Sequence, residues 1–445
     1  MQTISQAQIL QKLGIEKLNA MQHQAMKAIG SGVDIQLLSP TGTGKTLAFL
    51  LPLVLKLVSG RAENNSPKLR MLVLAPSREL AMQIEQVAKA MGSGLKINVV
   101  YGGRQIAKDK DELKQDPDVL IGTPGRVADH FRRETVDFTG IEYLVLDEFD
   151  KSLEIGFESE MKEIISSLGG LTQRLLTSAT QLNDIPEFVG LGKHDHLNFL
   201  DNKPNAFLEI KTIVSPEKDK LPTLVNALRH LDNQSGIVFL NFKDSIKRVS
   251  EYLTEEGVPH GCFYGGMEQF DRELALIKFR NGSHKLLLAT DLAARGIDVP
   301  KLGFIIHYHF PIKLEEFTHR NGRTARMQAE GKAFILKWKG EDLPEYMQEV
   351  SAIGFEEEAI TDAPLPSPSK WNTLRISAGR KDKISKGDIA GWLMKQGGLA
   401  KDSVGMIELK PDMAFVALKA NNINKLTKQL AEIKLKGRKV KVTVV

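Results

Sequence analysis

Cysteine is almost absent from this 445-residue chain, which contains only Cys262. A single cysteine forms neither an intrachain disulfide nor a cysteine-based zinc site. We therefore expect no disulfide-linked partner, and a reducing, cytoplasmic setting fits this composition.

Long apolar runs are also missing. The most apolar stretch, residues 47–58, is interrupted by Pro52 and Lys56 and is shorter than the roughly 20 residues that a membrane helix needs. The first ten residues, MQTISQAQIL, have no basic region followed by an apolar core, so they do not read as a secretory signal. We expect a buried helix at residues 47–58 and no membrane partner.

Acidic residues are scarce at the C-terminal end. Residues 370–445 contain 17 Lys and Arg against 6 Asp and Glu, whereas residues 1–369 contain 43 against 49. A mildly acidic body with a basic tail suggests a polyanion that binds the tail. Composition alone is equally compatible with a solvated lysine surface.

Short apolar segments alternate with helical patterns through the first two thirds of the chain. Helical patterns occupy residues 79–91 and 269–280. The alternation predicts an α/β fold, with parallel sheets covered by helices on both faces. The expected strands are residues 71–75, 97–100, 119–122, 143–146, 175–177, 236–240, 286–290 and 304–308.

Two changes of composition divide the chain. Residues 201–205 read as a linker, and residues 363–370, APLPSPSK, read as an extended spacer across which few packing contacts should pass. The remaining residues predict a βαββαβ order, the ferredoxin-like α+β arrangement of RNA-recognition motifs. We therefore expect domains at residues 1–203, 204–365 and 370–445.

A phosphate-binding loop is predicted at residues 39–46, Ser-Pro-Thr-Gly-Thr-Gly-Lys-Thr. Glycines let backbone N–H groups turn toward phosphate oxygens, and the N-terminus of the following helix adds positive potential. Lys45 would reach the β- and γ-phosphates, and the Thr46 hydroxyl would bind Mg²⁺. The strict P-loop pattern has glycine where Ser39 stands, so this string alone is an imperfect match.

A second acidic string, Asp-Glu-Phe-Asp at residues 147–150, follows the apolar segment 143–146. A carboxylate at the end of a buried strand, here Asp147, can hold Mg²⁺ through water, and the next one, Glu148, can orient the attacking water. Acidic turns are common after strands. Behind a phosphate-binding loop, however, this turn predicts the second half of a nucleotide hydrolysis site.

Further short strings complete a family pattern. The first half contains Pro-Ser-Arg-Glu-Leu at 76–80, a glycine pair at 102–103, Thr-Pro-Gly-Arg at 123–126 and Ser-Ala-Thr at 178–180. The second half contains the strings at 264–272, 289–298 and 319–326. Each string is weak alone, but together, across residues 14–340, they resemble the motifs of DEAD-box RNA helicases. The resemblance implies two RecA-like lobes that use ATP, Mg²⁺ and RNA.

The resemblance also implies a role for each site residue. The implied catalytic residues are Lys45, Asp147, Glu148, Arg323 and Arg326, of which the two arginines act as arginine fingers from the second lobe. The implied nucleotide-binding residues are Gln22, Thr41, Gly42, Thr43, Gly44, Lys45, Thr46 and Asp291, with Gln22 on adenine and Asp291 on ribose. Thr46 and Asp147 would hold Mg²⁺, the latter through water. The implied RNA contacts are Arg78, Gly102, Gly103, Thr123, Arg126 and Thr290.

Spacing adds one expectation to this set. Arg320, Arg323 and Arg326 recur every three residues, which predicts a shared helical face. The planar, permanently charged guanidinium suits a γ-phosphate.

The sequence departs from the family at several positions. No aromatic residue precedes Phe49, whereas the family usually has one upstream of the adenine-reading glutamine. The phosphate chemistry is therefore better supported than the adenine selectivity. Residues that differ from the usual Pro, Ala, Ala, Ile and Gly are Leu18, Ser39, Phe149, Asn321 and Ala325.

The tail resembles the RNA-binding domain of bacterial DEAD-box helicases of the DbpA and cold-shock types, especially at residues 379–388. This resemblance implies binding to structured RNA, and we expect ribosomal RNA. Phe415 matches an aromatic position of RNA-recognition motifs, although it is equally well a core residue. Trp371 and Trp392 are expected to pack. Binding would depend mainly on Arg380, Lys381, Lys383, Lys386 and the basic cluster at 434–441.

We therefore expect an ATP-dependent RNA helicase that separates short duplexes locally, in ribosome assembly. Three alternatives remain open at this point. These are an RNA chaperone without turnover, a cold-shock or RNA-turnover helicase, and a DNA translocase of the same superfamily.

Overall fold

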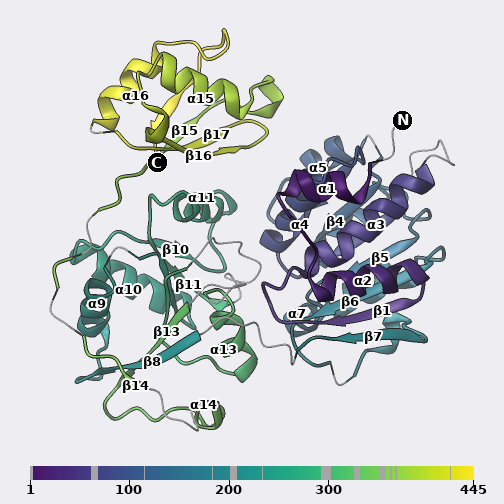
Figure 1. Cartoon of the computed structure of the whole chain (residues 1–445), viewed down its shortest axis with the longest axis horizontal. Helices are drawn as coiled ribbons and strands as arrows, with labels where there is room; N and C mark the ends of the chain where they lie inside the picture. Colours follow the sequence, from purple (N-terminus) through teal and green to yellow (C-terminus); the bar gives the residue numbers. More distant parts are fainter. Residues whose placement is uncertain are drawn as a thin grey trace. The chain divides into compact units, whose positions relative to one another are not determined.

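A computed structural model describes most of the chain. It contains two seven-stranded parallel sheets and one four-stranded antiparallel sheet, with helices on both faces of each parallel sheet (Figure 1). The first of two compact units contains the first sheet, and the second unit contains the other two sheets. The described residues are 4–61, 69–114, 116–182, 184–200, 208–232, 234–291, 302–324, 331–350, 356–360, 363–365, 368–420 and 422–445.

The first lobe has the strand order β3-β4-β2-β5-β6-β1-β7. Its strands are β1 (Asp34–Leu38), β2 (Met71–Leu74), β3 (Ile97–Val100), β4 (Val119–Gly122), β5 (Tyr143–Leu146), β6 (Gln173–Ser178) and β7 (His194–Asn198). Its helices are α1 (Gln6–Leu13), α2 (Ala20–Ser31), α3 (Lys45–Arg61), α4 (Arg78–Ala90), α5 (Ile106–Leu113), α6 (Pro124–Arg132), α7 (Phe149–Ile155) and α8 (Glu158–Ser166).

Strands β1 to β6 bury side chains on both faces of the sheet, whereas the edge strand β7 has no buried side chain. In β2, Met71 and Val73 belong to the core under α1 to α4, whereas Leu72 and Leu74 belong to the core under α5 to α8. The cause is the two-residue period of a strand, which points successive side chains to opposite faces. Continuous apolar strands are therefore the correct signature of this sheet.

The second lobe has the order β10-β11-β9-β12-β13-β8-β14. Its strands are β8 (Leu208–Ser215), β9 (Gly236–Phe239), β10 (Gly261–Phe263), β11 (Leu286–Ala289), β12 (Phe304–His307), β13 (Gly331–Trp338) and β14 (Glu356–Glu357). Its helices are α9 (Leu221–His230), α10 (Lys243–Glu255), α11 (Gln269–Arg280), α13 (Leu314–Asn321) and α14 (Glu345–Val350). The α/β class is thus confirmed for both lobes.

The tail domain has the predicted βαββαβ order. Its elements are β15 (Asn372–Ile376), α15 (Lys386–Lys395), β16 (Val404–Leu409), β17 (Ala414–Leu418), α16 (Ile423–Ala431) and β18 (Val442–Val444). The antiparallel order is β16-β17-β15-β18. Both helices pack on one face of this sheet, around Leu374, Val416 and Trp392.

Other expectations have mixed outcomes. The helix expected at 47–58 is confirmed as part of α3, and no helix in the described ranges is long and apolar enough to span a membrane. The linker at 201–205 lies outside the described residues, so the exact domain bounds stay a prediction. The expectation of few contacts across the spacer is wrong, because the Ser369 hydroxyl donates to the Gly282 carbonyl at 2.5 Å and Arg280 pairs with Glu408.

Candidate nucleotide and RNA site

The site residues of the first lobe follow the carboxyl ends of six strands. The phosphate-binding loop follows β1, the acidic string follows β5, and Ser178 ends β6; these three strands are neighbours in the sheet. Arg78, Gly102 and Thr123 come soon after β2, β3 and β4, which are also neighbours. Parallel strands place all these ends at one edge, where open α/β sheets bind ligands. Nucleotide and RNA motifs therefore occupy adjoining halves of one edge.

The phosphate-binding loop is shaped around Lys45, the first residue of α3. The Lys45 Nζ donates to the carbonyl oxygens of Ser39 and Pro40, at 2.5 and 2.9 Å. Gly42 and Gly44 adopt φ of 81° and 90°, a left-handed conformation that side chains disfavour. This loop holds a cation at the N-terminus of a helix, where a phosphate is favoured.

Gln22 links α2 to this loop. Its Nε2 donates to the Gly44 carbonyl at 3.3 Å, and its Oε1 accepts from the Asn19 N–H at 3.0 Å. The Asn19 amide in turn donates to the Thr43 carbonyl at 2.9 Å. The start of α2 is thus tied to the loop at two points. Contact between Gln22 and adenine stays a prediction.

Asp147 is 2% exposed at the end of β5. Burial raises the pKa of its carboxyl, while a hydrogen bond from Thr177 and the charge of Lys45 oppose part of that rise. The Thr177 hydroxyl donates to Asp147 and accepts from the Glu148 N–H, the latter at 3.2 Å. Glu148 has φ of 48°, a costly conformation for a residue with a Cβ. Thr177 therefore fixes both members of the acidic pair.

The Ser-Ala-Thr string contacts the same acidic turn. The Thr180 hydroxyl donates to Asp150 at 2.7 Å, and the Ser178 hydroxyl donates to the Thr180 carbonyl at 2.7 Å. Because of the Thr180–Asp150 hydrogen bond, a movement of the Ser-Ala-Thr string would also move the acidic turn, and the reverse. The sequence identified both strings but not these hydrogen bonds, and it did not single out Thr177.

The phosphate-binding loop and Asp147 together fit a nucleoside triphosphate with a divalent metal. The loop supplies backbone donors, an ammonium and the half-buried Thr46 hydroxyl at a helix N-terminus. Asp147 supplies a carboxylate whose pKa is raised by burial, against the opposing effects of the Thr177 hydrogen bond and the Lys45 charge. A bound metal would supply charge that stabilises such a carboxylate.

The predicted RNA-contact residues of this lobe lie close together. Arg126 donates from Nε to the Tyr101 carbonyl at 3.1 Å and also to the Arg104 carbonyl, on either side of the glycine pair. A Cβ on Gly103 would collide with the Arg78 guanidinium. Arg78, Gly102, Gly103 and Arg126 therefore form one group around the loop after β3.

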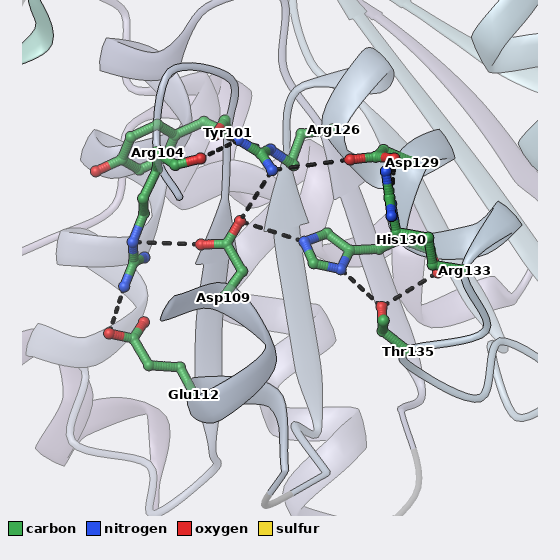
Figure 2. Close-up of polar contacts among 9 residues, drawn as sticks. All are labelled: Tyr101, Arg104, Asp109, Glu112, Arg126, Asp129, His130, Arg133 and Thr135. Carbon is green, nitrogen blue, oxygen red and sulfur yellow. Dashed lines mark hydrogen bonds and ion pairs between the residues drawn. The ribbon is translucent and has the colours of Figure 1, made fainter. Parts of the chain in front are cut away.

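A buried carboxylate supports this loop (Figure 2). Asp109 lies 3.2 Å from Arg104 Nε, 3.7 Å from Arg126 Nη1 and 3.2 Å from His130 Nε2. His130 Nδ1 is 2.6 Å from the Thr135 hydroxyl. Arg126 is only 9% exposed, so its guanidinium mainly makes contacts within the lobe. Sequence reasoning missed Asp109, on α5, because two of its partners, Arg126 and His130, lie on the separate helix α6.

In the second lobe, Arg320 organises the residues around Asp291. Arg320 is 1% exposed and donates to both carboxylate oxygens of Asp291, at 2.6 and 2.5 Å. It also donates to the His309 carbonyl and to Asn241 Oδ1, each at 2.8 Å. Every part of this guanidinium has a partner within the lobe. Arg320 therefore holds Asp291, which was expected to contact ribose.

The expected single helical face of arginines is wrong in detail. Helix α13 ends at Asn321, and Arg323 follows in a turn in which its N–H donates to the Arg320 carbonyl at 3.1 Å. Arg326 lies outside the described residues. The arginine-finger roles stay predictions.

His307 stabilises the same region. Its Nε2 lies 2.9 Å from Asn321 Oδ1, and both residues are buried. Burial and the charge of Arg320 lower the pKa of His307 to about 3. The ring is therefore neutral, and Nε2–H donates because an amide oxygen only accepts. Asn321, a departure from the family, thus has a buried partner.

The remaining predicted residues lie after β11 and in the tail. Thr290 directly follows β11, and its N–H donates to the Phe263 carbonyl at 3.3 Å. In the tail, the predicted RNA-binding residues Arg380, Lys381, Lys383 and Lys386 are all exposed. They lie between β15 and the first turn of α15. Trp392 packs in the tail core as expected, and Phe415 is 2% exposed.

Comparison with known families agrees with this arrangement. Residues 19–188 match the family described as DEAD/DEAH box helicase, residues 219–328 match the helicase conserved C-terminal domain, and residues 373–444 match the DbpA RNA binding domain. The chain belongs to the DEAD-box ATP-dependent RNA helicases, of the DbpA type. It is therefore an RNA-stimulated ATPase.

Individual relatives support the assignment over nearly the whole length. The ATP-dependent RNA helicase DbpA of Escherichia coli is 31% identical, covering 97% of this chain and 95% of the relative. The Bacillus subtilis protein of the same name is 30% identical, covering 97% and 96%. A structure of Saccharomyces cerevisiae Dbp5 bound to RNA and ADP BeF3 has a TM-score of 0.67 and 25% identity, covering 78% of this chain and 90% of that one.

Proposed function

We propose that this DEAD-box helicase hydrolyses Mg²⁺-ATP with the residues gathered at the carboxyl edge of the first lobe. Lys45 binds the β- and γ-phosphates, Thr46 and Asp147 hold the metal, the latter through water, and Glu148 orients the attacking water. The observation that carries this proposal is the Thr177 hydroxyl bonded to both members of the acidic pair. Such an arrangement fixes a general base before the substrate arrives.

The second lobe completes the site in this proposal. Asp291 contacts the ribose, and Arg323 and Arg326 neutralise charge on the γ-phosphate. ATP and single-stranded RNA each favour the closed state of the lobes, because each binds that state more tightly than the open one. Loss of the γ-phosphate removes the arginine contacts, and the lobes reopen.

A carboxylate-to-amide substitution tests the hydrolytic assignment. Glu148→Gln keeps the shape of the side chain but removes the base, so ATP and RNA should still bind while hydrolysis is almost lost. The measurements are ATPase activity with saturating RNA and nucleotide affinity by fluorescence titration. Near-normal ATPase activity in Glu148→Gln would show that Glu148 is not the catalytic carboxylate.

For the target, we propose structured ribosomal RNA, bound by the tail in the cytoplasm during ribosome assembly. The match to the DbpA RNA binding domain and the exposed residues Arg380, Lys381, Lys383 and Lys386 support this proposal. Phosphate contacts by lysine and arginine supply affinity for any polyanion. The choice of RNA therefore has to be tested directly.

The test compares RNAs at constant length and charge. Structured ribosomal RNA fragments should stimulate the ATPase at lower concentration than scrambled RNAs, and Lys383→Glu should weaken that stimulation. Lys401→Glu, an exposed substitution in the loop after α15, is the matched control. If scrambled RNA works equally well, a general cold-shock or RNA-turnover role replaces the ribosomal one. Stronger stimulation by DNA would favour a translocase.

A further inference from the structure

One face of the tail sheet is not covered by the tail's own helices. Glu408, Phe415 and Arg375 lie opposite one another on β16, β17 and β15, so their side chains share a face. The intervening residues Leu374 and Val416 point to the opposite face, into the core with α15 and α16. In RNA-recognition motifs the face without helices is where bases stack on aromatic side chains.

Helix α11 of the second lobe packs on this face. The rings of Phe270 and Phe415 have centroids 6.4 Å apart with planes inclined by 43°. The Arg375 guanidinium lies 5.0 Å from the centroid of the Phe270 ring, a cation–π distance. Phe415 is buried as a result. The aromatic position that would stack on a base is thus occupied by a side chain of the lobe.

Charged residues fix the orientation of this contact. Arg280, the last residue of α11, donates to Glu408 in three hydrogen bonds of 2.9, 2.7 and 2.8 Å. Lys410 lies 3.2 Å from Glu273, also on α11. Planar pairing of an arginine with a carboxylate tolerates little rotation. The two ion pairs therefore specify one register between helix and sheet.

The turn after α11 adds buried hydrogen bonds. The Asn281 amide donates to the Thr373 hydroxyl at 2.9 Å, and the Ser283 and Thr373 hydroxyl oxygens are 2.7 Å apart. Thr373 is 1% exposed. Separation of lobe and tail would leave these groups to find new partners, which disfavours a partly open state.

We propose that this interface stays closed throughout the ATPase cycle. The second lobe and the tail then respond to RNA as one body, and the covered sheet face takes no RNA. The proposal rests on the proposed function in one respect, since it assumes that the tail captures RNA. RNA held by the exposed residues of the tail, such as Lys381 and Lys383, then orients the lobe that carries Asp291.

A charge-reversal cycle in the full chain tests the interface. Arg280→Glu and Glu408→Arg each place like charges together, whereas the double variant restores an opposite pair. We expect each single variant to be cut faster by protease in the spacer. Each should also need at least about fivefold more structured RNA for half-maximal ATPase activity, the lower end of typical coupling. The double variant should return to within about twofold of wild type.

Controls separate this proposal from the function on which it rests. Lys247→Glu, an exposed substitution on α10, should leave spacer cleavage and RNA requirement unchanged. Maximal ATPase activity with unstructured RNA should be unchanged in all variants. If structured RNA fails to stimulate the wild type, the proposed target is wrong, whereas cleavage still reports on the interface. A double variant that behaves like the single variants overturns the interface.

A disulfide lock tests whether the interface opens. Ser283→Cys with Thr373→Cys, in a Cys262→Ser background, places two thiols where the hydroxyl oxygens are 2.7 Å apart. Oxidised glutathione takes two electrons and two protons from the thiols and is reduced as the bond forms. We expect the lock to form in the folded chain and RNA-stimulated ATPase activity to stay within about twofold of the reduced form. Failure to form, or a locked enzyme that loses activity restored by reductant, overturns the proposal.

Discussion

Thr177 donates to Asp147 and accepts from the Glu148 N–H. The same short side chain therefore fixes the carboxylate proposed for the metal and the backbone of the proposed base. Because Glu148 adopts a left-handed conformation, an anchor at its N–H offsets part of a backbone cost. The residue lies one position before the Ser-Ala-Thr string, and no chemical pattern marks it in the sequence.

Thr177→Val should separate positioning from binding. Valine keeps the shape but removes both hydrogen bonds, so ATPase activity at saturating RNA should fall about 10- to 100-fold, as for other residues that orient ligands of a metal. Nucleotide affinity should change little, since the phosphate-binding loop is untouched. Thr177→Ser is the matched control and should keep most of the activity. Equal losses in both variants would contradict the hydrogen-bonding role.

Asp147 gives a prediction about stability. Its pKa is raised in the folded state, so its favourable contribution is present below the unfolded pKa and is lost as pH rises through the folded value. At neutral pH the buried carboxylate therefore destabilises the first lobe. Asp147→Asn should abolish hydrolysis yet raise the unfolding temperature without nucleotide, by about 2–4 °C for each kcal/mol recovered. Asp195→Asn, an exposed substitution on β7, should leave it unchanged; a lower temperature for Asp147→Asn would refute the argument.

At the scale of elements, strand prediction succeeded for most strands whose two faces are buried, although β13, which is buried on both faces, was not predicted. β3, β4 and β5 have the predicted bounds, and in each of them three or four of the four residues are buried. β7 was missed because it is a polar edge strand, and β8 was missed because Glu209 and Lys211 interrupt its apolar residues. Exposure of one face changes the pattern from continuous to alternating.

The candidate site was likewise predicted only in part. Residues that contact nucleotide form short contiguous strings, so Lys45, Asp147 and Glu148 could be predicted from the sequence. Their supports could not, because Asp109 on α5 meets Arg126 and His130 only after α6 has packed against it. Likewise, the cover over Phe415 comes from α11, more than 100 residues earlier in the chain.

β12 and α13 are joined by a buried pair whose strength depends on pH. The pKa of His307 is lowered to about 3, so its contribution is present above the unfolded pKa and is lost as pH falls below it. Each pH unit below about 6.5 should then cost the second lobe about 1.4 kcal/mol from this residue. His307→Gln should flatten the dependence of unfolding free energy on pH between 6.5 and 5. Parallel curves for the two proteins, measured by urea denaturation, would exclude this assignment.

At the scale of the whole molecule, the basic tail and the lobes divide two tasks. A chain ending at residue 365 should still hydrolyse ATP with enough single-stranded RNA, but should bind structured RNA more weakly. If about five tail charges meet phosphates, the log–log salt slope should fall by roughly 3.5 to 4.5. Loss of the cover over Phe270 should also lower the unfolding temperature of the second lobe. Equal affinity and salt slope for the two chains would show that the tail is only a solvated basic surface.

The packing of α11 against the tail sheet limits how freely these helicases can exchange RNA-binding domains. A foreign domain fused after the spacer would bring its own affinity for RNA. It would be flexibly linked to the second lobe, however, and would have no fixed orientation relative to it. A grafted domain therefore needs an acid at position 408, a hydroxyl at 373 and an aromatic ring at 415. These groups contact Arg280, Asn281 and Phe270 of the second lobe, respectively. Chimeras designed in this way should transfer both the RNA specificity of the grafted domain and a fixed orientation of the bound RNA relative to the second lobe.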